Sequence, residues 1–332
     1  MRNFSKILAG LALLVLLLIG ADRVGRMFYE SAMDSVIFTR EELKEAEGTI
    51  ETLLVGNSLI HWGMDPHIVE EKLDTICFNM GSSAQSIAGS YYIIKDQLEK
   101  NPVNRIFLAL SVQLLLTDEE VTDARLPVWD RLMTNKVKLE YLLSEAEPKE
   151  WEQFLFYPCR VDNVLNFTQI ERNVSYKKTE LFKARQTFPG AKYTYYGKGF
   201  ETRRRSFDGE TVEHLWSYGI WDETRIKEKN VEYLNKIVDL CGEKNVELNF
   251  IVFPHAKEFA DMQGDLSAMD QYLTEFCKKT KTGLYNYNYT AYEGVYEIFT
   301  EKHFQDQKHF NLRGSELFTE MLCDAYLEKE QE

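Results

Sequence analysis

Short apolar runs alternate with amphipathic segments along most of the chain. Runs typical of buried strands lie at residues 50–55, 75–80, 105–111, 246–254 and 283–288. Segments with helical periodicity lie between and after them, at 65–73, 86–100, 226–242, 266–279 and 311–327. Five short strands that alternate with helices predict an α/β three-layer sandwich with a parallel sheet. We expect the strand order 2-1-3-4-5, which places a crevice beside the first strand, where the connections reverse direction.

The alternation stops between about residues 115 and 224. This stretch is rich in aromatic and charged residues and has helical patterns near 131–145 and 150–156. We interpret 115–224 as a mostly helical insertion that forms a cap within a domain spanning 50–332.

The N-terminus begins with a longer apolar run, at residues 7–21, after Arg2 and Lys6. Fifteen residues are few for a complete membrane span but many for a signal-peptide core. A cut after Ala21 would place Ile19 where cleavage sites have a small residue, so an uncleaved anchor is favoured. We therefore predict a transmembrane signal anchor at 1–27, a linker or stalk at 28–49, and a single-pass protein of the cell membrane with its main domain outside the cytoplasm.

Composition excludes several classes of partner and cofactor. The formal net charge of −14 argues against nucleic acid, which binds clusters of Lys and Arg. Five single cysteines have neither a disulfide framework nor zinc-ligand spacing, so we predict no metal and no cofactor. A nucleotide binder is disfavoured, because no Gly-x-Gly-x-x-Gly motif follows a strand and P-loop spacing is missing.

Candidate chemistry begins with Gly56-Asn57-Ser58-Leu59, directly after the first predicted strand. A serine at this place is held where its hydroxyl can meet a ligand. Near the other end of the chain, Asp306 and His309 supply a carboxylate and an imidazole three residues apart. Ser58 as nucleophile, His309 as base and Asp306 as orienter would form a triad for acyl transfer.

Other residues could complete or replace parts of this triad. The backbone N–H groups of Ser58 and Gly81 are the expected oxyanion donors, because Gly81 ends the second strand. His303 is a rival base, but no carboxylate stands three residues before it. We interpret His61 as a wall of the site and His255 as an ordinary loop histidine.

These motifs resemble those of SGNH (GDSL-type) hydrolases, which have a flavodoxin-like sandwich. The resemblance is nearest to a membrane-anchored bacterial branch that includes the D-alanine transfer protein of teichoic acid modification and alginate O-acetylation proteins. The first family block matches Gly56 to Leu59, with Asn57 in place of the name-giving aspartate, and the second matches Asn79 to Ser82. The last block matches Asp306 and His309, followed by Phe310-Asn311 and Gly314, and a weaker signature is Tyr196-Gly197-Lys198-Gly199-Phe200. The resemblance implies the same triad, with Gly81 as an oxyanion donor.

The sequence departs from the family at the third block, where standard members carry a Gly-x-Asn whose side chain serves the oxyanion hole. Here the third strand ends in Leu110-Ser111-Val112-Gln113. Either Ser111 or Gln113 substitutes for the asparagine, or the enzyme is slow toward generic esters. Loss of one such donor costs about 3 kcal/mol of transition-state stabilisation.

The resemblance implies an extracytoplasmic serine acyltransferase or esterase that acts on acyl groups of a cell-envelope polysaccharide or teichoic-type polymer. It also implies a membrane-bound O-acyltransferase as the acyl-donating partner. Arg203, Arg204 and Arg205 could form a positive patch for an anionic polymer, although such a run is commonly a solvated face. The alternative is a non-catalytic assembly or binding protein of the same acylation complex.

Overall fold

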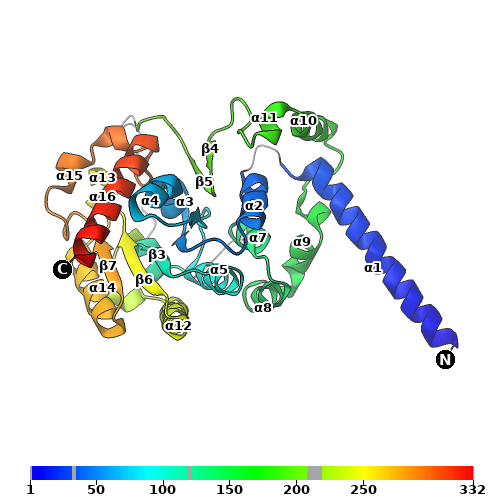
Figure 1. The fold of residues 1–332 in the computed structure, drawn as a ribbon, viewed down its shortest axis with the longest axis horizontal. Helices are drawn as coiled ribbons and strands as arrows, with labels where there is room; N and C mark the ends of the chain where they lie inside the picture. The colour runs from blue at the N-terminus through cyan, green and yellow to red at the C-terminus, as the bar shows by residue number, and fades with distance from the viewer. Residues whose placement is uncertain (1, 32–34, 119–121, 208–218, 332) are drawn as a thin grey trace.

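A five-stranded parallel sheet forms the centre of the protein. The computed structural model describes residues 2–31, 35–118, 122–207 and 219–331 (Figure 1). All neighbouring strands of the sheet are parallel, in the order β2 (Cys77–Asn79), β1 (Thr52–Val55), β3 (Arg105–Leu110), β6 (Glu247–Val252) and β7 (Gly283–Asn286). Counted among themselves along the chain, these five strands have the order 2-1-3-4-5, so the predicted topology is confirmed.

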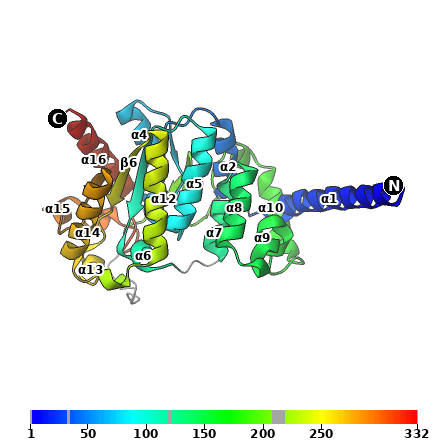
Figure 2. The same ribbon diagram turned by 90° about the horizontal axis from the view of Figure 1, so that it is seen from below.

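Both faces of the sheet are buried beneath helices, because alternate residues of each strand point to opposite faces. Leu53 and Val55 pack in one apolar cluster, whereas Leu54 packs in the other. The first cluster includes residues of α5 (Ile87–Lys100), α12 (Glu228–Lys244) and α14 (Leu266–Thr280). The second includes residues of α3 (Ser58–Gly63), α4 (Pro66–Leu73) and α16 (Leu312–Glu330). Figure 2 shows α5 and α12 lying side by side over their face of the sheet.

Helix starts follow local signals in the sequence. The Asp65 side chain accepts a hydrogen bond from the His67 N–H, and Pro66 takes the first helical position of α4. Ser86 and Asn311 cap α5 and α16 in the same way. Short elements near the strand ends are α6 (Val112–Leu116), η4 (Glu223–Arg225), α13 (Lys257–Ala260), α15 (Val295–Ile298) and η5 (Glu301–His303).

The segment expected to form a cap contains several short helices and a hairpin. The helix expected near 131–145 forms as α8 (Asn135–Glu145), and α7 (Thr122–Arg131) precedes it after a short break. The other elements are η1 (Pro148–Glu150), α9 (Trp151–Leu155), η2 (Tyr157–Arg160), α10 (Phe167–Lys177), α11 (Glu180–Lys183), β4 (Thr194–Gly197) and β5 (Phe200–Thr202). Residues 119–121 and 208–218 of the expected cap lie outside the described residues.

The β4–β5 hairpin docks on the end of strand β2. Its turn residue Lys198 accepts a hydrogen bond from the Asn79 N–H at 2.9 Å through its carbonyl oxygen. The next residue, Gly199, has φ +81°, and a Cβ there would overlap the Asn79 carbonyl oxygen. The conformation and the close approach both require glycine. The Tyr196-to-Phe200 signature is therefore the place where the cap meets the sheet.

The N-terminal region consists of a projecting helix and a packed one. Helix α1 (Arg2–Tyr29) extends away from the domain (Figure 1), and its last turns contact the cap, where the Asn173 side chain donates to the Phe28 carbonyl at 3.1 Å. Helix α2 (Val36–Glu45) lies in the expected linker or stalk, yet Phe38 and Leu43 are buried. Across the described residues, no helix combines the length and apolar character that a membrane crossing needs, so the expected transmembrane span is not supported.

We predict that Gly199→Ala destabilises the protein by at least about 2 kcal/mol more than Gly190→Ala. Gly190 is a matched control, because it also has positive φ, at +89°, but a Cβ there meets nothing within 4 Å. In the control, stability should fall only by the cost of placing alanine in a left-handed backbone conformation, about 1–2 kcal/mol. Urea unfolding of both variants measures the difference. Equal decreases in the free energy of unfolding would show that Gly199 is not in close contact with Asn79.

Candidate active site

The nucleophile candidate Ser58 is the first residue of helix α3. Strand β1 ends at Val55. The next residue, Gly56, has φ +148°, and a Cβ there would approach the Ala109 Cβ to 2.9 Å. Asn57 then caps the helix, and its Oδ1 accepts a hydrogen bond from the Leu59 N–H at 3.0 Å. Asparagine and aspartate are equally good caps, which explains why Asn57 can stand where related motifs carry aspartate. The cap places the Ser58 hydroxyl at the carboxyl end of the sheet.

The structure brings Ser58, His309 and Asp306 together in one line of hydrogen bonds. The Ser58 Oγ lies 2.8 Å from His309 Nε2. On the other side of the ring, His309 Nδ1 lies 2.8 Å from Asp306 Oδ1. The same carboxylate oxygen accepts the N–H groups of Lys308 and His309, at 2.9 and 3.0 Å. The three-residue spacing therefore makes a tight turn that aligns carboxylate and imidazole.

The electrostatics of Asp306 suit an orienting role. Burial raises the pKa of its carboxyl, but the hydrogen bond and charge of His309 and the two backbone N–H groups outweigh burial, so the pKa lies below its ordinary value. An ionised Asp306 can only accept, which assigns the proton of the neutral imidazole to Nδ1. His309 Nε2 then carries the lone pair that faces the Ser58 hydroxyl. This arrangement can take a proton from Ser58 as it attacks an acyl carbon.

The expected oxyanion donor Gly81 is already engaged. Its N–H donates to the Asn79 Oδ1 at 3.0 Å, so in this structure it is not free to meet an oxyanion. The reason is a local turn in which the Asn79 side chain folds over the backbone that follows it. By contrast, the Ser58 N–H, at the first position of α3, has no hydrogen-bond acceptor among the described residues.

Asn79 itself is a buried support of the site that sequence reasoning did not assign. Its Nδ2 donates to the carbonyls of Ile60 and Met64, at 2.8 and 2.9 Å, and so holds the end of helix α3. The residue is fully buried, and each of its side-chain hydrogen bonds is made. An asparagine at the end of a predicted strand was the available signal.

The two predicted substitutes for the third-block asparagine, Ser111 and Gln113, have other surroundings in this structure. The Ser111 Oγ accepts a hydrogen bond from the Leu114 N–H at 3.3 Å and caps helix α6. Gln113 is exposed. In the described part of the chain, no hydrogen bond joins either residue to Ser58 or His309. The strand ends in a helix cap here, so its polar residues serve the backbone.

The three consecutive arginines do not form one patch. The Arg203 guanidinium carbon lies 4.4 Å from the centre of the Tyr193 ring. Tyr193 in turn stacks on Trp62 at 4.7 Å, and Trp62 meets the His309 ring edge-on at 4.6 Å. Only Arg203 is thus connected to the triad. Arg204 and Arg205 are exposed, and Arg204 donates from Nε to the Tyr196 hydroxyl at 3.3 Å.

Three other histidines named in the sequence analysis have partners of their own. His303 belongs to the capping box of η5, where its Nδ1 accepts from the Thr300 N–H at 3.1 Å, so it is not the base. His61 is buried and pairs through Nε2 with Glu201 at 3.0 Å. His255 was interpreted as an ordinary loop residue, but its Nδ1 lies 3.1 Å from the Lys308 carbonyl oxygen. It therefore supports the loop that carries the triad.

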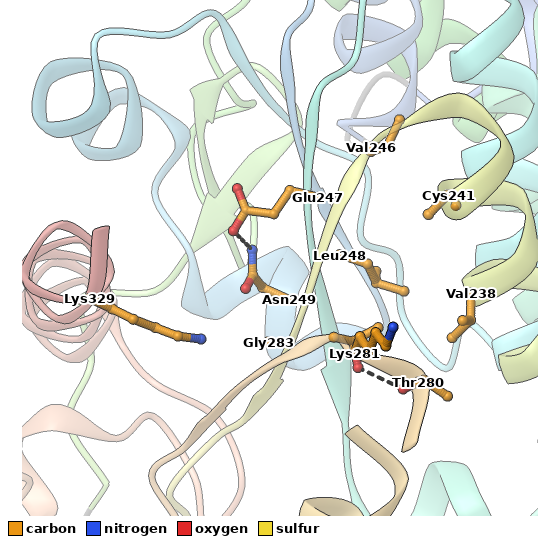
Figure 3. A pocket seen from close by; sticks show the side chains of 12 residues that line it. Val238, Cys241, Val246, Glu247, Leu248, Asn249, Thr280, Lys281, Gly283 and Lys329 are labelled. Carbon is orange, nitrogen blue, oxygen red and sulfur yellow. Dashed lines mark hydrogen bonds between the residues drawn. The ribbon is translucent and has the colours of Figure 1, made fainter. Parts of the chain in front are cut away.

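A cavity outside this site opens at the amino ends of β6 and β7. Its lining includes Glu247, Asn249, Lys281 and Lys329 (Figure 3). The triad lies at the carboxyl ends of the strands, which is the opposite edge of the sheet. Among the described residues, no group of three or more His, Cys, Asp or Glu side chains could hold a metal ion.

No protein-family model matches the chain, and no curated protein matches it.

We predict that His255 makes the protein less stable as the pH falls from about 6.5 to about 4. Burial lowers the pKa of His255 from its ordinary value of 6.5 to about 4. Between these values the unfolded chain binds a proton that the folded protein does not, so stability decreases toward acid pH. His255→Asn keeps a donor for the Lys308 carbonyl and cannot titrate. Urea midpoints at pH 7 and pH 5 should differ less for this variant than for the wild type, and an equal difference would contradict the prediction.

Proposed function

We propose that this protein is a serine acyltransferase or esterase of SGNH type that acts outside the cytoplasm on acyl groups of a cell-envelope polysaccharide or teichoic-type polymer. The observation that carries the proposal is the pair of 2.8 Å contacts from Ser58 Oγ to His309 Nε2 and from His309 Nδ1 to Asp306 Oδ1. A nucleophile, base and orienter in this order are the geometric signature of acyl transfer.

The reaction would use His309 twice. As the Ser58 Oγ attacks the acyl carbonyl, His309 Nε2 takes the hydroxyl proton, and ionised Asp306 stabilises the resulting imidazolium. The proton then passes to the leaving group, which departs and leaves an acyl ester on Ser58. An acceptor hydroxyl of the polymer, or water, loses its proton to His309 and attacks this ester. The acyl group moves to the acceptor and Ser58 is regenerated.

The number of free oxyanion donors favours a substrate that a partner enzyme delivers over an ester that arrives by diffusion. The Ser58 N–H is one available donor, whereas the Gly81 N–H is held by Asn79. One missing donor lowers the rate by about 10²–10³-fold. A donor enzyme that presents an activated acyl group would offset such a loss. We accordingly propose a membrane-bound O-acyltransferase as the partner, and the polymer as acyl acceptor.

The N-terminal helix supports attachment of the protein to the cell membrane. Leu13, Leu16 and Leu17 are each at least 60% exposed on α1. Apolar side chains this exposed and this contiguous are typical of a surface that lipid or a partner covers. Attachment through α1, with the domain on the extracytoplasmic side, would hold the triad near an envelope polymer.

A second candidate function is a non-catalytic assembly or binding protein of the same acylation complex. The engaged Gly81 N–H favours it, as does the helix-capping role of Ser111. In this alternative the triad would be a structural remnant and Ser58 would be inert.

We predict that a fluorophosphonate probe labels Ser58 covalently. Oγ attacks phosphorus and fluoride leaves, with His309 taking the proton. Ser58→Ala should abolish labelling, and His309→Ala or Asp306→Asn should slow it by about 10³–10⁴-fold. Ser83→Ala is the matched control, because Ser83 is exposed in the neighbouring loop after β2. Mass spectrometry of the labelled peptide identifies the site, and an unlabelled Ser58 in folded wild-type protein would favour the non-catalytic alternative.

We also predict that the exposed leucines of α1 attach the protein to lipid. Replacing Leu13, Leu16 and Leu17 with serine should abolish co-flotation with phospholipid vesicles. Leu139→Ser/Leu143→Ser is the control, since these cap leucines are also more than half exposed, at 56% and 59%. Loss of flotation in the control alone would place the lipid contact on the cap instead.

A further inference from the structure

A buried carboxylate from the cap reaches the helix that carries Ser58. Glu201 lies on β5, and its Oε1 accepts from His61 Nε2 at 3.0 Å and from Trp62 Nε1 at 3.4 Å. The Ser35 side chain makes a further hydrogen bond to the same carboxylate. Only 14% of the Glu201 side chain is exposed. Three segments that are distant in the sequence thus meet at one acidic group.

This contact is a strong link between cap and core. Burial raises the pKa of Glu201, but the charge and hydrogen bond of His61 and the bonds from Ser35 and Trp62 outweigh burial, so the pKa is lowered and the carboxylate stays ionised. Removing one member of a buried hydrogen-bonded pair leaves the polar group of the other without its partner. The cap hairpin and helix α3 are therefore held in one fixed relation.

The same contact extends to the base of the triad. Trp62 is held at its indole nitrogen by Glu201, and its ring meets the His309 ring edge-on at 4.6 Å. Tyr193, from the cap segment, stacks on the Trp62 ring, and the centres of the two rings lie 4.7 Å apart. The two ring nitrogens of His309 contact Asp306 and Ser58. These contacts leave the ring free to rotate about the line that joins the two nitrogens, and the contact with Trp62 restricts this rotation.

We propose that Glu201 is a positioning residue for acyl transfer, because it fixes both the Ser58 helix, through His61, and the His309 ring, through Trp62. This inference rests on the proposed function. It makes the cap hairpin part of the active site: the core alone carries all three triad residues but lacks the group that sets their geometry.

The test compares Glu201 with a second carboxylate that holds the same hairpin. Glu42 accepts from the Tyr195 hydroxyl and from the Lys198 N–H, each at 2.6 Å, and among the described residues it contacts neither α3 nor His309. Glu201→Ala should slow fluorophosphonate labelling of Ser58 by about 10²-fold per folded molecule, since small misplacements of reacting groups have effects of this size. Glu201→Gln keeps one acceptor oxygen and should lose about tenfold. Glu42→Gln should label at the wild-type rate, with urea unfolding used to correct for the folded fraction.

A spectroscopic readout keeps this test separate from the proposed function. The proton between His309 Nδ1 and Asp306 should give a low-field NMR signal, which Glu201→Gln shifts or broadens and Glu42→Gln leaves unchanged. If wild-type Ser58 is inert, the proposed function fails and this signal alone decides whether Glu201 positions the ring. Equal labelling rates in Glu201→Gln and wild type, or an unchanged signal, overturn the inference. Equal losses in the Glu201 and Glu42 variants also overturn it, because they would show that both only hold the hairpin.

Discussion

The candidate site depends on one buried amide side chain. Asn79 holds the end of helix α3 through the Ile60 and Met64 carbonyls, and its Oδ1 accepts from the Gly81 N–H. Its backbone N–H donates to Lys198 of the cap hairpin. A hydrophobic residue of the same size would leave these buried backbone groups unpaired, each at a cost of about 1–3 kcal/mol. The helix that carries Ser58, the turn after β2 and the cap therefore share one point of attachment.

This arrangement has a chemical consequence. The hydrogen bond that orders the turn also occupies the Gly81 N–H, which would otherwise be a natural donor to an oxyanion. In the described part of the chain, Ser58, His309 and Asp306 are thus aligned, while the Gly81 N–H that the sequence offered as a donor is engaged. Under the proposed function, such a site would favour an acyl group that arrives activated and positioned, since a lost donor weakens stabilisation of the developing charge.

Much of the architecture follows from local sequence signals. The five strands of the main sheet and the helices with caps at Asp65, Ser86 and Asn311 lie within a few residues of their predicted places, because apolar periodicity and capping act over short distances. The strand order also follows, since right-handed crossovers between parallel strands leave few alternatives. In the cap, short helices without a strong apolar stripe gave weaker signals, and the break between α7 and α8 was not predicted.

For the site, the sequence by itself determined that Ser58 follows a buried strand and that Asp306 and His309 stand one turn apart before a capped helix. These are local facts, and the parallel sheet carries both motifs to the same edge. Only the tertiary structure decided which polar groups are free and which are engaged. The Gly81 N–H is taken by a side chain two residues away, Ser111 caps a helix, and Glu201 reaches Trp62 across 139 residues of chain. No periodicity or spacing in the sequence predicts such contacts, because each depends on how the chain packs around the carboxyl edge of the sheet.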